Sequence, residues 1–249
     1  MPPFQVENLH PGLSIDCVIF GFHENELKVL LLKLKRLDKW ALPGGFVEKG
    51  RDVDEEAARV PEQRSGLKGI FLRQFHLFGD ANRNDEGHAA LLVEKKIIPK
   101  TLQGWFEQRF VTIGYFALLE YSKVEQPEPD YTSEACEWCS LKDLPDMILD
   151  HKKIVAKAHE ALKKELNYQP VGLDLLPDQF TMPELQALYE TILEKQLDRR
   201  NFRRKILSYD ILIPTDKHRT GVRHKAPLLY EFDREKYRRA TLAGLNSGW

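Results

Sequence analysis

The first half of the chain alternates runs rich in β-branched and aromatic residues with runs of helical spacing. Residues 14–22 (SIDCVIFGF) and 26–34 (ELKVLLLKL) predict two strands joined by a polar turn, and therefore a hairpin. Residues 52–64 (DVDEEAARVPEQR) predict a helix that opens with acidic residues, as the positive N-terminal end of a helix favours. This alternation predicts an α/β domain. Its other expected elements are strands at 109–121 and 136–141, helical structure within 143–166, and an inserted segment with partial structure at 86–108.

The pattern changes after residues 169–180 (QPVGLDLLPDQF), which hold two prolines and a glycine and indicate a boundary. Residues 182–196 have apolar positions at helical spacing, with Pro183 in the first turn, and predict an amphipathic helix. Asp198 is suited to cap a second helix, and two strands, 211–215 and 227–232, follow around a basic loop. Helix, turn, helix and hairpin together predict a winged helix-turn-helix. We therefore expect a ligand-sensing domain with a connecting helix over 1–170, and a DNA-binding domain over 171–249.

The composition is that of an ordinary globular protein, with 42% hydrophobic and 30% charged residues. No apolar run is long enough to cross a bilayer, and the first ten residues do not have the pattern of a signal peptide. Three cysteines provide no disulfide framework and suit a reducing compartment. These features predict a cytoplasmic protein with no membrane partner.

The basic charge of the chain is local. The whole chain has a net charge of -1, but residues 195–225 hold ten lysines and arginines against three aspartates, a net of +7. A local basic patch is the electrostatic footprint of a nucleic-acid-binding surface. If Phe202 points inward, the outward face of the second helix presents arginine and asparagine, which read base edges or hold phosphates. The candidate DNA contacts are Arg199, Arg200, Asn201, Arg203 and Arg204 on the helix, and Arg219, Arg223, His224 and Lys225 on the wing.

The wing residues are expected to grip the DNA backbone or to reach a minor groove. The alternative for the helix is a solvated basic surface with no partner, because most charge runs in proteins face water. A helix and a basic wing in one segment favour the DNA-binding interpretation.

Residues 44–67 (GGFVEKGRDVDEEAARVPEQRSGL) keep the spacing of a pyrophosphate-cleaving motif but not its acids. The stretch resembles the Nudix box, which that family writes as G, five residues, E, seven residues, R-E-U-x-E-E-x-G-U. Counting from Gly45, the residues Arg59, Gly66 and Leu67 fall on their expected positions. The four acidic positions are occupied instead by Arg51, Val60, Gln63 and Arg64.

Hydrolysis in the Nudix family uses a divalent metal held by carboxylates, so this loss predicts an inactive box. Glu62 is one position away from an expected ligand, and a helix turns by about 100° per residue, which points it elsewhere. Pro61 would cost about 3 kcal/mol in a helix interior unless the helix bends or breaks there. The remaining acids around the box, among them Glu48 and Glu56, are expected to be a solvated helix start. We therefore predict no catalytic residue, no metal and no cofactor; the alternative is an active Nudix hydrolase of ADP-ribose-like nucleoside diphosphates.

Arg51 and Arg64 are candidate ligand-binding residues, because guanidinium groups near a vacated metal site can hold phosphate directly. The alternative is that each pairs with a neighbouring acid, as surface arginines commonly do. Two smaller signals have ordinary explanations. Cys136 and Cys139 form a single C-x-x-C, which is weak evidence for zinc. Asp150 beside His151 is expected to be a helix cap next to a surface histidine.

The chain is similar as a whole to the Nudix-related bacterial transcriptional regulators. The resemblance rests on the degenerate box, on 144–162 (LPDMILDHKKIVAKAHEAL), on 170–181 (PVGLDLLPDQFT) and on 197–207 (LDRRNFRRKIL). That group includes ADP-ribose-responsive repressors of NAD metabolism and arabinose-responsive regulators of sugar use. The resemblance implies a Nudix-like α/β/α sandwich with a C-terminal winged helix-turn-helix domain. It also implies a homodimer, a palindromic double-stranded DNA operator and a small effector, either an ADP-ribose-like nucleotide or a pentose.

Segment 86–108 is longer than in near relatives, which puts the rim of the effector pocket in doubt. Two further function classes stay open at this point, an RNA-binding protein and a protein-interaction scaffold.

Overall fold

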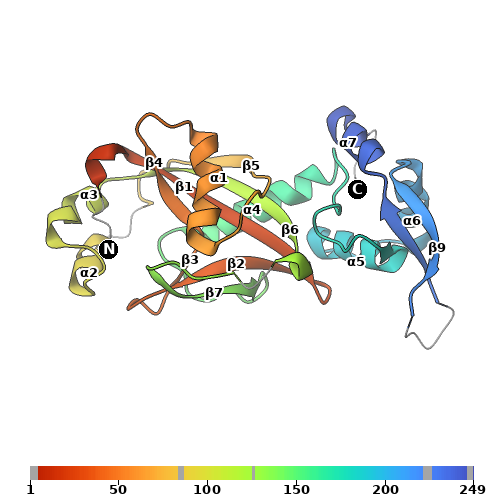
Figure 1. Ribbon diagram of the computed structural model, residues 1–249, viewed down its shortest axis with the longest axis horizontal. Helices are drawn as coiled ribbons and strands as arrows, with labels where there is room; N and C mark the ends of the chain where they lie inside the picture. The colour runs from red at the N-terminus through yellow and green to blue at the C-terminus, as the bar shows by residue number, and fades with distance from the viewer. Residues whose placement is uncertain (1–4, 84–86, 125–126, 221–225, 246–248) are drawn as a thin grey trace. The chain divides into compact units, whose positions relative to one another are not determined.

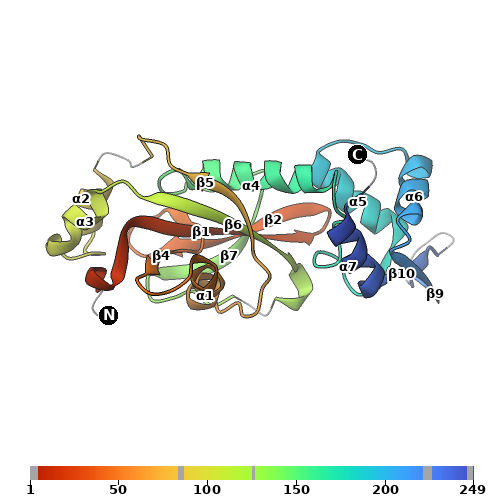
Figure 2. The same ribbon diagram turned by 90° about the horizontal axis from the view of Figure 1, so that it is seen from above.

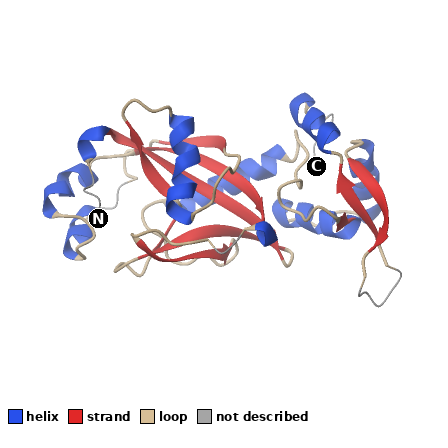
Figure 3. Cartoon of the chain, viewed as in Figure 1, coloured by secondary structure: helices blue, strands red, loops and turns tan. Residues whose placement is uncertain are grey.

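The computed structural model describes residues 5–83, 87–124, 127–220, 226–245 and 249. The chain divides into two compact units. The first comprises residues 1–20, 28–118 and 124–158, and the second comprises residues 21–27, 119–123 and 159–249. Figure 3 shows that the first unit is built mainly on a sheet and the second mainly on helices with a small sheet.

A seven-stranded sheet forms the first unit, with β3, β2, β1, β6 and β5 in that order (Figure 1). Strand β4 also pairs with β1, and β7 pairs with β2. The expected hairpin is confirmed as β1 and β2, which are neighbours in the sheet. The strands are β1 (Leu9–His23), β2 (Glu26–Leu34), β3 (Trp40–Ala41), β4 (Gly44–Glu48), β5 (Arg73–Phe78), β6 (Val111–Glu120) and β7 (Ser133–Ser140).

Helix α1 (Val53–Ser65) covers one face of this sheet, and the first half of α4 (His151–Glu165) covers the other (Figure 2). The core under α1 is apolar and includes Ile15, Cys17, Val47, Ala57 and Val60. Neighbouring residues of β1 point the opposite way, because side chains alternate along a strand. The expected α/β/α layering is therefore confirmed, with polar positions of β1 on the face beneath α4.

Pro61 lies inside α1 without ending it. A proline at this position has no N–H to donate to the carbonyl of Ala57, four residues earlier. The buried Cys17 thiol contacts this carbonyl instead, with 3.9 Å between Sγ and the oxygen. The sheet thus supplies a weak substitute for the missing helical bond, and α1 runs on to Gly66, whose φ of 74° ends it.

The inserted segment contains helices α2 (His88–Glu94) and α3 (Gln103–Glu107), which pack together. Trp105 and Phe106 from α3 pack against Phe46 of β4, with ring centroids 4.6 and 6.0 Å away. Phe110, which follows α3, packs against both Phe46 and Trp105. The partial structure expected for this segment is confirmed, and an aromatic cluster attaches it to the strand before the box.

The second unit has the expected helix, helix and hairpin. Helix α5 (Met182–Leu193) begins in a capping box in which Thr181 and Glu184 each bond to the backbone of the other. Helix α6 (Arg199–Ser208) is capped by Asp198, which accepts from the Asn201 amide at 2.9 Å. A three-stranded sheet completes the winged helix in the order β8 (Phe180–Thr181), β10 (Leu228–Phe232), β9 (Leu212–His218).

Two features differ from the sequence-based expectation or extend it. Helical structure was expected within 143–166, and the α-helix there begins only at His151. Helix α7 (Arg234–Ala243) was not predicted, although Asp233 caps it in the same way as Asp198 caps α6. Among the described residues, no helix is long and apolar enough to cross a membrane.

Candidate functional site

The box positions carry a compact charged cluster on β4 and α1. Arg59 donates to Glu48 at 2.6 Å and to Glu56 at 2.7 Å. Arg51 donates to Glu48 at 3.1 Å and lies 3.4 Å from the other oxygen of Glu56. Glu56 is only 1% exposed, so its expected place on a solvated helix start was wrong. The hydrogen bond from Arg59 lowers the pKa of Glu48, and two carboxylates and two guanidinium groups make the cluster neutral.

This cluster does not fit a divalent metal. A magnesium site needs oxygen ligands with excess negative charge, and both carboxylates here already accept from arginine. Val60 occupies a box position at which the family has an acid. It packs against Gly45 so closely that a Cβ atom at position 45 would lie 2.8 Å from the Val60 side chain. In the part of the chain that the structure describes, no group of three acids, histidines or cysteines could hold a metal ion.

Arg64 is held at the other end of α1. It forms an ion pair with Asp130 and donates to Thr132 at 2.7 Å. The Asp130 side chain is 5% exposed and that of Arg64 is 20% exposed, whereas that of Arg51 is 47% exposed. Arg51 precedes the first residue of α1 and Arg64 lies in its last turn, so about 16 Å of helix, at about 1.5 Å per residue, separates them. The structure therefore does not bring the two candidate arginines together, and each pairs with an acid as in the alternative interpretation.

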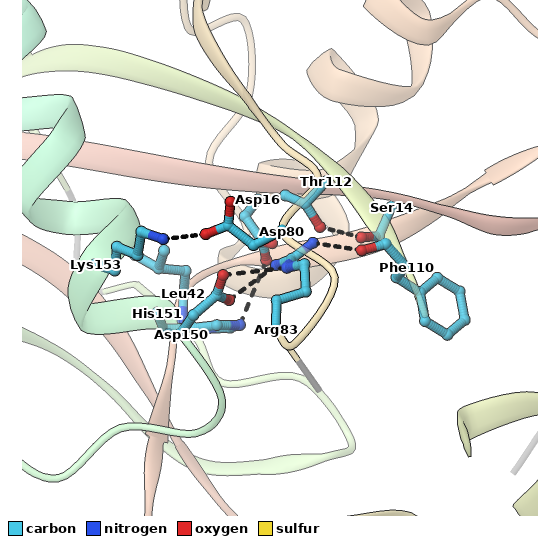
Figure 4. A network of polar contacts seen from close by, with 10 residues as sticks. All are labelled: Ser14, Asp16, Leu42, Asp80, Arg83, Phe110, Thr112, Asp150, His151 and Lys153. Atoms are coloured by element: carbon cyan, nitrogen blue, oxygen red, sulfur yellow. Dashed lines mark hydrogen bonds and ion pairs between the residues drawn. The ribbon is translucent and has the colours of Figure 1, made fainter. Parts of the chain in front are cut away.

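A polar network lies on the face of the sheet beneath α4 (Figure 4). Arg83 donates to both oxygens of Asp150, at 2.8 and 3.1 Å, and to the Phe110 carbonyl at 2.8 Å. Lys153 pairs with Asp80, so two ion pairs join the segment after β5 to the start of α4. Arg83 precedes the inserted segment and Phe110 follows it. The Arg83 side chain, which bonds to the Phe110 carbonyl, therefore joins the two ends of the insertion.

His151 belongs to the same network. Its Nδ1 accepts from the Leu42 amide at 2.9 Å, and its Nε2 lies 3.7 Å from the Asp16 carboxylate. The histidine is 5% exposed, so the expected surface position was wrong. Burial lowers its pKa in spite of Asp16, and the acceptor role of Nδ1 requires the neutral ring. Asp16 itself was missed, although a charged residue between Ile15 and Cys17 in an apolar strand was a usable signal.

The exposed face of α6 is the candidate nucleic-acid interface. Phe202 and Ile206 are buried, and Phe202 packs against Tyr189 of α5. The candidate helix residues are all exposed. Arg204 donates to the Asn201 side chain at 2.9 Å, and Arg203 reaches the Tyr230 hydroxyl at 3.4 Å. Within the described residues, Arg199 and Arg200 make no such contact, and their guanidinium groups face solvent.

The wing residues divide into two groups. Arg219, at the end of β9, forms a two-oxygen ion pair with Glu184 of α5. The other three candidates, Arg223, His224 and Lys225, lie outside the described residues. The DNA contacts expected for all of these residues stay predictions.

Comparison with known proteins matches two family models to the chain. The model of the NUDIX domain matches residues 10–158, and the model of the NrtR DNA-binding winged helix domain matches residues 172–232. The first match covers more than half of the chain and contains both the charged cluster and the polar network.

Among its relatives, the chain is 28% identical over 234 residues to the ADPR responsive transcriptional repressor NtrR of Acinetobacter baylyi, covering 91% of this chain and 84% of the relative. It is 28% identical over 150 residues to an ADP-ribose pyrophosphatase of Methanocaldococcus jannaschii, covering 59% and 72%. Among solved structures, Shewanella oneidensis NrtR complexed with a 27mer DNA has a TM-score of 0.73 at 25% identity, covering 95% of this chain and 99% of that chain.

Proposed function

The chain belongs to the Nudix family, and from that premise we propose that it is an ADP-ribose-responsive transcriptional repressor. The winged helix unit binds a double-stranded DNA operator, and the Nudix domain binds the effector without cleaving it. The relative that matches nine-tenths of this chain is named as such a repressor, and the structure related over nearly the whole chain is a DNA complex. A regulator of this kind acts on cytoplasmic DNA.

The observation that carries the DNA-binding role is the outward face of α6. The helix begins at a capped N-terminus, is anchored by Phe202 and Ile206, and leaves Arg199 and Arg200 exposed. Arginine and asparagine at the start of a helix are suited to the major groove, where they recognise guanine and adenine edges. We assign base or phosphate contact to this face, and a homodimer would place two copies on a palindromic operator.

The box cluster supports effector binding without hydrolysis. Arg51 is the half-exposed member, and both of its carboxylate partners, Glu48 and the buried Glu56, are also paired with Arg59, so neither loses its last cation when Arg51 turns toward a phosphate. Arg64 is held by a buried acid and is less suited to that exchange. We therefore propose Arg51 as the phosphate contact of ADP-ribose and retain Arg64 as a weaker candidate. A pentose effector stays the alternative signal.

The second candidate function is ADP-ribose hydrolysis, which the similarity to a pyrophosphatase favours. Incubation with ADP-ribose and Mg²⁺ or Mn²⁺ decides between the two, and we expect no product above a no-enzyme control. Metal-dependent product at enzymatic rates would replace the regulator interpretation with a hydrolase.

Effector binding is tested by thermal shift with ADP-ribose, NAD and arabinose, each in excess EDTA, because a ligand raises apparent stability by mass action. We expect ADP-ribose to raise the melting temperature equally with and without EDTA, and Arg51→Ala to reduce that rise. Lys68→Ala, which removes an exposed positive charge paired with Glu62, is the matched control for charge. A shift with arabinose alone would make the pentose the signal.

A further inference from the structure

Arg219 occupies an unexpected place for a DNA contact. Its guanidinium Nη2 lies 2.6 and 2.5 Å from the two carboxylate oxygens of Glu184. The two side chains are 35% and 42% exposed, so the pair is accessible to water but well formed. Arginine and carboxylate in this arrangement make strong, charge-assisted hydrogen bonds.

Both partners stand at structural junctions of the second unit. Arg219 follows β9, and its amide donates to the Pro227 carbonyl at 3.0 Å. This bond joins the two strands of the wing outside their regular pairing. Glu184 is in the first turn of α5, where it also accepts from the Thr181 amide at 2.7 Å.

The wing is tied to the same turn by a second connection. Thr181 pairs with Leu229 of β10 through the short strand β8. Strand β10 is therefore attached to the start of α5 by backbone pairing, and the end of β9 is attached to it by Arg219. The ion pair therefore fixes β9, the first strand of the hairpin, whereas β10, the second strand, is already fixed by its pairing with β8.

We propose that Arg219 is a positioning residue, which sets the angle of the wing through Glu184 rather than holding a DNA phosphate. This inference rests on the proposed DNA-binding function. Both bonds come from Nη2 of Arg219, and the charge of Glu184 already offsets that of the guanidinium group, which makes Arg219 a weaker phosphate ligand than an unpaired arginine. Retaining both bonds keeps the hairpin in place for the rest of the wing.

Glu184→Gln separates the two roles. Glutamine keeps the capping box, which accepts Glu or Gln at this position, but it removes the ion pair and leaves Arg219 with its full charge. A phosphate role predicts equal or tighter DNA binding, because Arg219 is released and a negative charge is lost. A positioning role predicts weaker binding, by about fivefold, the size of a well-formed exposed ion pair.

The experiment measures duplex affinity by fluorescence anisotropy for the wild-type protein, Glu184→Gln, Arg219→Ala and the double variant. We expect the double variant to bind as weakly as either single variant, because each removes the same connection. Asp216→Asn removes a negative charge from exposed β9 and is the control, for which we expect no loss of affinity. Tight binding by Glu184→Gln, or additive losses in the double variant, would overturn the proposal.

Hydrogen exchange of the DNA-free protein gives a readout that does not depend on DNA binding. We expect faster exchange at the amides of β9 and β10 in both single variants, with α6 unchanged. Faster exchange in a protein that binds no duplex would refute the proposed function but would still show that the Arg219–Glu184 ion pair holds the wing. Unchanged exchange in both variants would refute the positioning role of Arg219.

Discussion

Replacing Arg83 by methionine should strongly destabilise the Nudix domain. The Arg83 side chain is 5% exposed and that of Asp150 is 14% exposed, so the variant leaves a largely buried carboxylate without its partner. Breaking a buried ion pair in this way costs about 3–5 kcal/mol. Asp150 keeps some contact with water and lies beside the N-terminus of α4, which favours a negative charge, so we expect about 3 kcal/mol. The Phe110 carbonyl loses its donor in the same change.

The assay is calorimetric unfolding of the full chain, in which a loss of this size corresponds to a fall of about 6–12 °C in melting temperature. The double variant Arg83→Met with Asp150→Asn should lose less than the single variant, because no buried charge remains. A single variant that melts within about 2 °C of the wild-type protein would refute the reasoning. A double variant that melts below the single variant would show that the unpaired charge of Asp150 is not what destabilises Arg83→Met.

Three other predictions concern His151, the two box arginines, and Asn201 on α6. Because the folded-state pKa of His151 is lowered, the unfolded chain takes up the proton first, and the free energy of unfolding should fall as pH drops below about 6.5. His151→Gln should make this fall shallower in denaturation series at pH 5 to 7, and an unchanged slope would contradict the assignment. Arg64→Ala should lower stability by about 2 kcal/mol, since it leaves buried Asp130 without its cation. Arg51→Ala should cost less, about 1 kcal/mol, because buried Glu56 keeps its ion pair with Arg59; equal losses in thermal unfolding would contradict this difference. Asn201→Ala should weaken operator binding by about 1–3 kcal/mol and binding to random duplex by less, and equal weakening in a direct competition would assign Asn201 to phosphates.

The winged helix could be predicted closely because its signals are local. Asp198 caps α6, Pro183 lies in the first turn of α5, and the apolar stripe of α5 is buried, all as the spacing indicates. Each of these features depends on residues within one or two turns of each other. The same local reasoning applied to Asp233 would have found α7.

The box was predicted in spacing but not in environment. Buried Glu56 shares Arg59 with Glu48, which lies on a different element, and Val60 of the same helix packs against Gly45 of β4. The tolerance of Pro61 depends on a thiol from β1, forty-four residues earlier in the chain. Such contacts between distant segments cannot be obtained from periodicity, which describes one element at a time.

The polar network was missed for the same reason. Arg83, Phe110 and Asp150 come from three separate segments and meet only when the sheet is formed. His151 was expected to be a surface residue beside a helix cap, whereas in the structure it is buried, accepts from the Leu42 amide and faces Asp16. A lone charged residue in an apolar strand is a sequence signal for such a network, although it does not identify the partners.

The proposed repressor binds both duplex DNA and ADP-ribose, and each ligand changes the affinity for the other. The most direct test titrates a duplex, selected from a random library by the protein itself, in the presence and absence of ADP-ribose and in excess EDTA. We expect ADP-ribose to weaken duplex binding by at least about fivefold and to be recovered intact. The same duplex affinity with and without saturating ADP-ribose would contradict the proposed function.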